Sequence, residues 1–334
     1  MINQKLHLNE LINTKSSAKK STREGFGEAI GNIAKDNPNV IALSADLSSS
    51  LKLEVFKKEN PKRFIQCGIA EQNMAGISAG LALSGKIPFM ASFACFSPSR
   101  NWDQIRVSIA QQCANVKIVG AHSGLSASTD GRSAQALEDI ALMRVLPNFT
   151  VIQPIDYEET IKVINESTKH KGPVYIRLHR EQFPEITTNK TPFEIGKAYI
   201  YKEGTDITLI ASGPILFEVL KAANNLQIKN KINAEVIAVP TIKPLDEPTI
   251  LKSAQKTQRV VTIEEHQIIG GLGSAVSEVL SEKMPVKMLR IGVNDTFGES
   301  GTYSELLDKY GLSAHHIEEK ILKFIKEYGY FNYW

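Results

Sequence analysis

Short apolar runs alternate with amphipathic segments along most of the chain. Residues 22–36 place Phe26, Ile30 and Ile33 at helical spacing, and residues 39–46 then form a short apolar run typical of a buried strand. The same unit recurs, so the pattern predicts strands at 63–68, 87–92, 116–121, 150–153 and 174–178 and helices at 71–84, 102–112, 135–144 and 157–168. Strands that alternate with helices indicate a parallel sheet covered on both faces.

A second series of alternating elements follows a stretch of weak periodicity. Residues 183–195 carry Pro184 and Pro192 and are typical of a linker. Beyond them, apolar runs predict strands at 207–211, 234–239, 259–263 and 286–291, with helices between them. We therefore predict an α/β protein with two doubly wound domains and mainly parallel sheets, divided into an N-terminal arm at 1–20, a first domain at 21–190 and a second domain at 191–334.

Composition and charge exclude several classes of protein. The 334 residues are enough for two domains, and a net charge of +3 with scattered Lys and Arg offers no basic face for nucleic acid. No apolar run approaches the ~20 residues of a membrane span, and the first 20 residues lack the apolar core of a signal peptide. Cys67, Cys95 and Cys113 form no CxxC pair, which favours a reducing compartment. We expect a soluble cytoplasmic protein.

Polar residues follow five of the predicted strands. In open parallel sheets, ligands bind beyond the carboxyl ends of the strands, so these positions are candidates for a site. Phe93 and Phe96 are the aromatic residues among them, and Glu71 begins a predicted helix. By position alone, Glu71 fits either a helix N-terminal acid or a catalytic carboxyl group. The polar segments are residues 46–50, 68–73, 92–100, 122–132 and 179–181.

Several long segments resemble the cofactor-binding core and the C-terminal domain of transketolases. The resemblance runs from about residue 22 to residue 325, and it is fairly specific for transketolases that are split into two chains. It implies a thiamine-diphosphate pyrimidine-binding domain followed by a transketolase C-terminal domain. The segments are GIAEQNMAGISAGLALSG, PFMASFACF, AHSGLSASTDG, ALEDIALMRVLPNFTVIQP, GPVYIRLHR and EEHQIIGGLGSAV.

The resemblance implies which residues bind the cofactor. Glu71 matches the family's catalytic glutamate, whose carboxyl group promotes the imino tautomer of the aminopyrimidine ring of thiamine diphosphate. Phe93 and Phe96 match the aminopyrimidine pocket, where aromatic rings can stack on a flat ring; ordinary core packing is the alternative. Asp46 matches an aspartate near the cofactor, with a plain loop acid as the alternative. Some members carry a tyrosine where this chain has Ser99.

The resemblance also implies a substrate-binding set. In the family, the residues that match Arg23, Ser50 and Arg180 hold a sugar phosphate, for which the planar fork of arginine is well suited. Arg177 is a nearby competitor for the role of Arg180, and a structural role is the alternative for each residue. His122 and Asp130 match residues that contact sugar hydroxyls. The full set is Arg23, Ser50, His122, Asp130 and Arg180.

One position departs from the family pattern. Transketolases usually carry a histidine where this chain has Ala134, and Arg132 beside it is also unusual. That histidine hydrogen-bonds the donor ketose, which alanine cannot do. The donor could differ, a neighbouring group of this chain or a partner could replace the histidine, or the protein could be a weak or repurposed paralogue. We favour a changed substrate.

The chain contains no Gly-Asp-Gly motif, through which the family holds the diphosphate by way of Mg²⁺. In the family this diphosphate-binding motif belongs to a separate N-terminal domain. The resemblance therefore implies a partner subunit that carries the Mg²⁺ ligands, no metal ligand in this chain, and an α₂β₂ assembly. We assign the second domain to assembly. Its Gly270, Gly271 and Gly273 fit either an anion-binding helix N-terminus or a tight strand-to-helix turn.

The expected function is that of one subunit of a thiamine-diphosphate-dependent, transketolase-like enzyme. It would transfer a two-carbon ketol unit from a ketose phosphate to an aldose phosphate, and only with the N-terminal subunit present. Ala134 leaves open a subunit that uses pyruvate or another 2-oxo acid. A non-catalytic paralogue that serves as a binding or assembly partner is the third possibility, against which the intact Glu71 argues.

Overall fold

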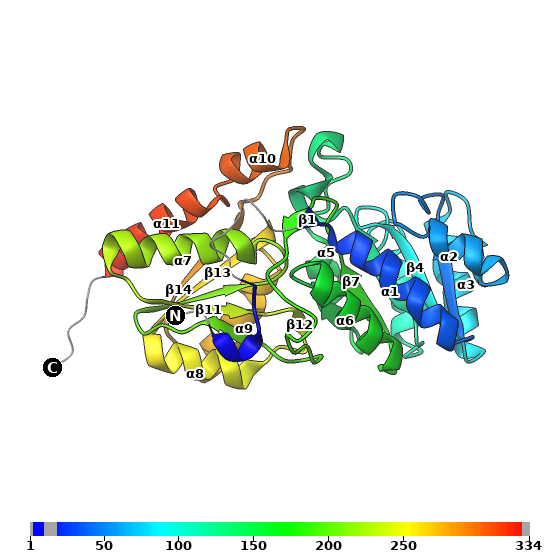
Figure 1. Cartoon of the computed structure of the whole chain (residues 1–334), viewed down its shortest axis with the longest axis horizontal. Helices are drawn as coiled ribbons and strands as arrows, with labels where there is room; N and C mark the ends of the chain where they lie inside the picture. The colour runs from blue at the N-terminus through cyan, green and yellow to red at the C-terminus, as the bar shows by residue number, and fades with distance from the viewer. Residues whose placement is uncertain (1–2, 10–18, 329–334) are drawn as a thin grey trace.

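Two large sheets organise the chain in the computed structural model, which describes residues 3–9 and 19–328. Figure 1 shows two lobes, each with a central sheet between helices; the first runs from blue to green and the second from yellow-green to red. The first sheet has seven strands and the second has five.

The first sheet is made from buried apolar runs. β2 (Val40–Ser44) and β5 (Lys117–Ala121) are buried at every position, as expected for strands covered on both faces. The strand order is β12-β6-β7-β5-β4-β2-β3, and β12 pairs antiparallel with β6 while the other neighbours are parallel. The remaining strands are β3 (Phe64–Gln66), β4 (Ile87–Phe93), β6 (Thr150–Ile152), β7 (Val174–Arg177) and β12 (Thr241–Lys243).

Helices cover both faces of this sheet. α1 (Thr22–Asp36) begins with a capping box between Ser21 and Glu24, which satisfies free N–H groups of its first turn. It packs beside α2 (Glu54–Glu59) and α6 (Tyr157–Lys169) on one face. The other face carries α3 (Glu71–Leu83), α4 (Trp102–Gln104) with the π-helical turn η3 (Ile105–Ala110), and α5 (Asp139–Arg144), while the 3₁₀ segments are η2 (Pro61–Arg63) and η4 (Gly124–Asp130).

The second sheet has the order β14-β13-β10-β11-β9, with the edge strand β9 antiparallel to β11. Figure 1 shows α7 (Leu216–Asn230) and α11 (Ala314–Tyr328) on one side of it and α8 (Glu247–Thr257) and α9 (Leu272–Lys283) on the other. α10 (Tyr303–Lys309) packs against η4 of the first lobe. The strands are β9 (Tyr199–Lys202), β10 (Ile207–Ala211), β11 (Ala234–Ala238), β13 (Arg259–Gln267) and β14 (Lys287–Val293).

The start of the chain lies against the second lobe. The 3₁₀ turn η1 (Gln4–Leu6) follows Asn3, whose amide donates to the carbonyl of Tyr201 at 2.9 Å. The short strands β1 (Lys19–Lys20) and β8 (Phe183–Pro184) form a small antiparallel sheet. The rest of the predicted 1–20 arm, residues 1–2 and 10–18, lies outside the described residues.

The predicted fold class is confirmed, because both large sheets are mainly parallel and carry helices on both faces. Several element predictions need correction. β9 and β12 were not predicted, because each is a short edge strand whose pairing partner is distant in sequence. The predicted helix at 102–112 is α-helical only over Trp102–Gln104 and is π-helical over Ile105–Ala110. Apolar spacing cannot predict this difference, because it does not distinguish i→i−4 from i→i−5 bonding. The predicted helix at 135–144 starts at Asp139, because Ala136 pairs with the loop after β5.

Two glycines of α1 allow a matched test of close packing. A Cβ on Gly27 would overlap the backbone oxygen of Lys52, whereas a Cβ on Gly31 would meet nothing within 4 Å. We expect Gly27→Ala to destabilise the protein by about 1–3 kcal/mol through overpacking. Gly31→Ala should stabilise it by roughly 0.5–1 kcal/mol, because alanine loses less entropy in a helix. Urea unfolding of both variants checks the contrast, and equal midpoints would contradict it.

Candidate functional site

Most of the predicted site residues lie at one edge of the first sheet. Strands β2, β4, β5 and β7 are parallel, so their carboxyl ends meet there. Phe93 ends β4, His122 directly follows β5, and Arg180 follows β7. Arg23 comes from the first turn of α1, and Glu71 begins α3.

The Phe93 ring connects the predicted cofactor residues with the predicted substrate residues. It stacks on the Phe96 ring with centroids 5.9 Å apart and planes 10° apart. Its other neighbour is the His122 imidazole, with centroids 3.7 Å apart and planes 25° apart. Phe93 and Phe96 are both only half-buried, so their rings are partly accessible from the site.

His122 is a neutral imidazole in a constrained position. Its side chain is buried, and its backbone φ of 55° is uncommon for a residue other than glycine. Burial, together with the positive charges of Arg23 and Arg180, lowers the pKa of His122 to about 3. Arg23 Nη1 lies 3.4 Å from Nε2, and arginine can only donate, so the imidazole proton is on Nδ1. Nδ1 is buried without a hydrogen-bond partner among the described residues, so its N–H is unsatisfied in this structure.

The neutral state of His122 predicts a pH dependence of stability. Unfolded histidine has a pKa near 6.5, so between about pH 6.5 and pH 3 the unfolded chain binds a proton that the folded chain does not, and stability falls as pH falls. Between pH 7 and pH 5 the wild type should lose about 2 kcal/mol more unfolding free energy than His122→Asn, whose side chain tolerates positive φ. Denaturant titrations at both pH values measure the difference, and parallel losses would refute the assignment.

Two arginines place positive charge beside His122. Arg23 Nη1 donates to the backbone oxygen of Ser50 at 3.0 Å, and its Nε is buried without a hydrogen-bond partner among the described residues. Burial and the charge of Arg180 lower the pKa of the Arg23 guanidinium. Arg180 Nη1 forms an ion pair with Asp130 Oδ2 at 3.1 Å. Neighbouring guanidinium groups that repel each other are a suitable place for an anion.

Glu71 is buried, and it is paired with a residue to which the sequence analysis assigned no role. Its side chain is 1% exposed and accepts from Arg100 Nη1 at 2.9 Å, while the Arg100 side chain is 48% exposed. The Arg100 guanidinium also lies over the Phe96 ring, 4.7 Å from its centroid. The available signal was the spacing, because Arg100 follows Phe96 by four residues in a helical turn.

Asp46 lies just beyond the carboxyl end of β2. It is exposed, with a backbone φ of 61°, and its amide donates to Gln66 Oε1 at 2.7 Å. Within the described part of the chain, no hydrogen bond or ion pair links the Asp46 side chain to the other candidates. Ser99, which stands where some family members have tyrosine, donates to the Ala94 oxygen at 3.4 Å.

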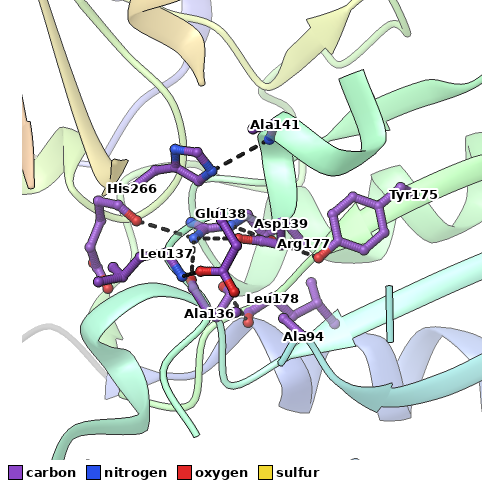
Figure 2. Close-up of polar contacts among 12 residues, drawn as sticks. Ala94, Ala136, Leu137, Glu138, Asp139, Ala141, Tyr175, Arg177, Leu178 and His266 are labelled. Atoms are coloured by element: carbon purple, nitrogen blue, oxygen red, sulfur yellow. Dashed lines mark hydrogen bonds and ion pairs between the residues drawn. The ribbon is translucent and has the colours of Figure 1, made fainter. Parts of the chain in front are cut away.

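Arg177, the alternative to Arg180 for phosphate binding, takes part in a buried set of polar contacts that we call the buried joint. It is fully buried, and its Nε and Nη2 contact the two carboxylate oxygens of Asp139 at 2.7 and 3.0 Å, as Figure 2 shows. Asp139 also accepts from the Tyr175 hydroxyl at 2.6 Å. Arg177 Nη2 donates further to the backbone oxygens of Ala136 and Glu265. These contacts use Arg177 for structure, and the role predicted for Arg180 stays a prediction.

The glycine-rich turn before α9 holds a carboxylate from the chain itself. The Glu264 side chain accepts from the amides of Leu272 and Gly273 at 2.7 and 2.8 Å. Burial raises the pKa of Glu264 to about 7, against the opposing effect of these amides. Of the two interpretations of this turn, the tight strand-to-helix turn is favoured, because the helix N-terminus is already filled.

Residues 3–9 and 19–328 contain neither a metal-binding cluster of side chains nor a helix suited to cross a membrane. No group of three or more His, Cys, Asp and Glu side chains in this part is arranged to hold a metal ion. None of the helices formed by these residues is long and apolar enough to cross a membrane.

Comparisons with known proteins agree with this architecture. The model for the transketolase pyrimidine binding domain matches residues 18–185, and the model for the transketolase C-terminal domain matches residues 196–317. A candidate transketolase C-terminal section of Methanocaldococcus jannaschii is 46% identical over 93% of this chain and 98% of its own length. A 6-deoxy-6-sulfo-D-fructose transketolase subunit of a Clostridium species is 41% identical over 88% of this chain and 91% of its own.

A solved structure of a split-gene transketolase, described as an inactive β4 tetramer, superimposes with a TM-score of 0.85 and 44% identity, covering 92% of this chain and 98% of that one. Family models, relatives and structure thus point to the same group of proteins. The chain belongs to the transketolase family, and it corresponds to the C-terminal section of that family, with a pyrimidine-binding domain and a C-terminal domain.

Proposed function

We propose that this chain is one subunit of an enzyme that transfers a two-carbon ketol unit from a ketose to an aldose. The observation that carries the proposal is the Phe93 ring, which touches both Phe96 on the Glu71 side and His122 on the arginine side. The residues predicted to bind the cofactor and those predicted to bind the sugar are therefore in contact with one another. We also propose a domain boundary near residue 190, which lies between the two family-model matches.

The residues around Glu71 fit thiamine diphosphate, on which the transketolase family depends. The Arg100 guanidinium is a flat, nitrogen-bearing group that lies over the Phe96 ring and donates to the buried Glu71 carboxylate. A flat aminopyrimidine ring held by Phe96 and Glu71 would make the same two kinds of contact. When bound, the cofactor supplies the carbon nucleophile of the reaction. Glu71 would hold a proton at its carboxyl oxygen toward the ring, and its burial keeps water away from that oxygen.

The arginine side of the site fits a sugar with an anionic end. Arg23 and Arg180 would bind the anionic group, with the carbonyl of Ser50 holding Arg23 in place. His122 and Asp130 would contact the sugar hydroxyls, with the Asp130 carboxylate accepting from one of them. The name of the Clostridium relative includes a sulfonated ketose, so the anionic group of a donor in this family need not be phosphate. Ala134 in place of the usual histidine supports a changed donor.

We further propose that the diphosphate and Mg²⁺ are held by a separate N-terminal subunit in an α₂β₂ complex. Two observations support this. The sequence has no Gly-Asp-Gly motif, and the similar split-gene transketolase is described as inactive when it forms a tetramer of β chains. Sites that form between chains need both subunits, so this chain alone would lack the diphosphate grip.

Calorimetric titration tests the proposal. Thiamine diphosphate with Mg²⁺ is titrated into this chain alone and into its mixture with an N-terminal subunit that bears Gly-Asp-Gly. Tight binding only in the mixture is expected, and donor screening with ketose phosphates, sulfonated ketoses and pyruvate follows on that complex. Equally tight binding to the chain alone would contradict the split site. Turnover of pyruvate but of no ketose would contradict ketol transfer.

A further inference from the structure

A buried acid of the second lobe contacts the first lobe next to the proposed anion-binding residues. Glu265, in β13, is 1% exposed. Its Oε2 accepts from the hydroxyl of Tyr303 at 2.5 Å and lies 3.3 Å from Nε2 of the fully buried His179. Tyr303 begins α10 of the second lobe, whereas His179 follows β7 of the first. The carboxylate therefore joins the two lobes.

The neighbours of Glu265 adjoin the substrate residues in sequence. His179 precedes Arg180, and its amide donates to Thr22 Oγ1 at 2.8 Å, while the Thr22 hydroxyl lies 3.3 Å from the His179 oxygen. Thr22 in turn precedes Arg23. One carboxylate thus connects, through His179, to both segments that carry the arginines.

The loop that carries His122 also rests on this carboxylate. Gly124 has a φ of +62°, and a Cβ at this position would overlap Glu265 Oε1. The Gly124 backbone is therefore packed directly on the Glu265 side chain. The loop is fixed on its other side by Ser123, whose hydroxyl donates to the Leu178 oxygen at 2.8 Å.

Glu265 is buried, and a buried charge is costly unless it is well paired. The Phe183 ring meets the rings of His179 and Tyr303 edge-on, with centroids 5.9 and 5.5 Å away. Burial raises the pKa of the Glu265 carboxyl, but His179, Tyr303 and Arg177 outweigh this effect and hold it below its ordinary value. A buried, paired charge can fix a geometry that an apolar side chain of the same size would not specify.

We infer that Glu265 is a positioning residue for the anion-binding part of the site, acting through His179 and Gly124 on the segments that carry Arg23, His122 and Arg180. This inference rests on the proposed function and gives the second lobe a role beyond assembly. It predicts that the charge of Glu265 matters more for a substrate with an anionic end than for the same sugar without one.

The test compares Glu265→Gln with Glu264→Gln in the complex with the N-terminal subunit. Glu264 is an equally buried neighbour, but it binds the α9 N-terminus instead. Glu265→Gln should raise KM for a ketose phosphate about tenfold while leaving KM for the same ketose without phosphate nearly unchanged, because only the arginine grip is displaced. Amide hydrogen exchange should become faster at residues 22–24 and 122–130. Glu264→Gln should leave both the KM ratio and these exchange rates as in the wild type.

Equal changes in KM for the two ketoses, or unchanged exchange at both segments, would overturn the inference. If Glu265→Gln does not assemble, Tyr303→Phe replaces it, since this change removes only the hydroxyl that donates to Glu265. It should shift the same KM ratio in the same direction by a smaller factor, and no shift would overturn the inference. A wild-type complex that turns over neither ketose would refute the proposed function instead, and the exchange comparison alone then decides whether Glu265 positions these segments.

Discussion

Glu71→Gln should lower kcat of the complete two-subunit complex by about 10²- to 10⁴-fold, the range that a positioned general acid–base group contributes. The amide keeps the size of the side chain and an oxygen that can accept from Arg100, so the local packing should persist. What it loses is the exchangeable carboxyl proton. The measurement is the steady-state rate of ketol transfer, together with cofactor titration to show that the complex is still loaded.

A matched control separates catalysis from helix capping. Glu54, like Glu71, is an acid in the first turn of a helix, but it is exposed and its carboxylate accepts from the Ser48 hydroxyl at 2.8 Å. Glu54→Gln should leave kcat unchanged. A Glu71→Gln complex that turns over at the wild-type rate would mean that Glu71 is only a helix N-terminal acid, and the proposed catalytic role would have to be abandoned.

Asp139→Ala should destabilise the chain by about 3–5 kcal/mol, the cost of leaving a buried charge without its partner. Asp139 and Arg177 are both fully buried, and the carboxylate is also the acceptor for the Tyr175 hydroxyl. Removing it strands the Arg177 guanidinium in the joint that Figure 2 shows. Urea unfolding of wild type and variant, followed by circular dichroism, measures the change.

Two further variants serve as controls for this prediction. Glu166→Ala removes the acid of an exposed pair with Lys169 and should leave the unfolding midpoint unchanged, since such surface pairs contribute little. Asp139→Ala combined with Arg177→Met should recover part of the loss, because no unpaired charge then remains buried. An unchanged midpoint for Asp139→Ala alone would show that the pair does not stabilise the joint.

The order of strands and helices could be predicted from the sequence because each buried element repeats its own apolar spacing. β2 and β5 are runs of buried residues with no alternation, and α1 carries Phe26 and Ile30 on one buried face. The candidate site could also be placed at the sheet edge, since the carboxyl ends of parallel strands collect there whatever the chain's identity. The resemblance then supplied the roles that these residues are proposed to have.

Long-range partners were decided only by the tertiary structure. Arg177 and Arg180 are alike in sequence, but only Arg177 faces the buried Asp139, and that contact depends on how α5 packs beside β7. Packing between distant segments also decides three other contacts. β12 pairs with β6, Arg100 lies over Phe96, and Glu264 accepts from the amides of its own glycine-rich turn. Periodicity along a chain records which side of an element is buried. It does not indicate which distant group lies opposite, because that depends on the packing of whole elements against one another.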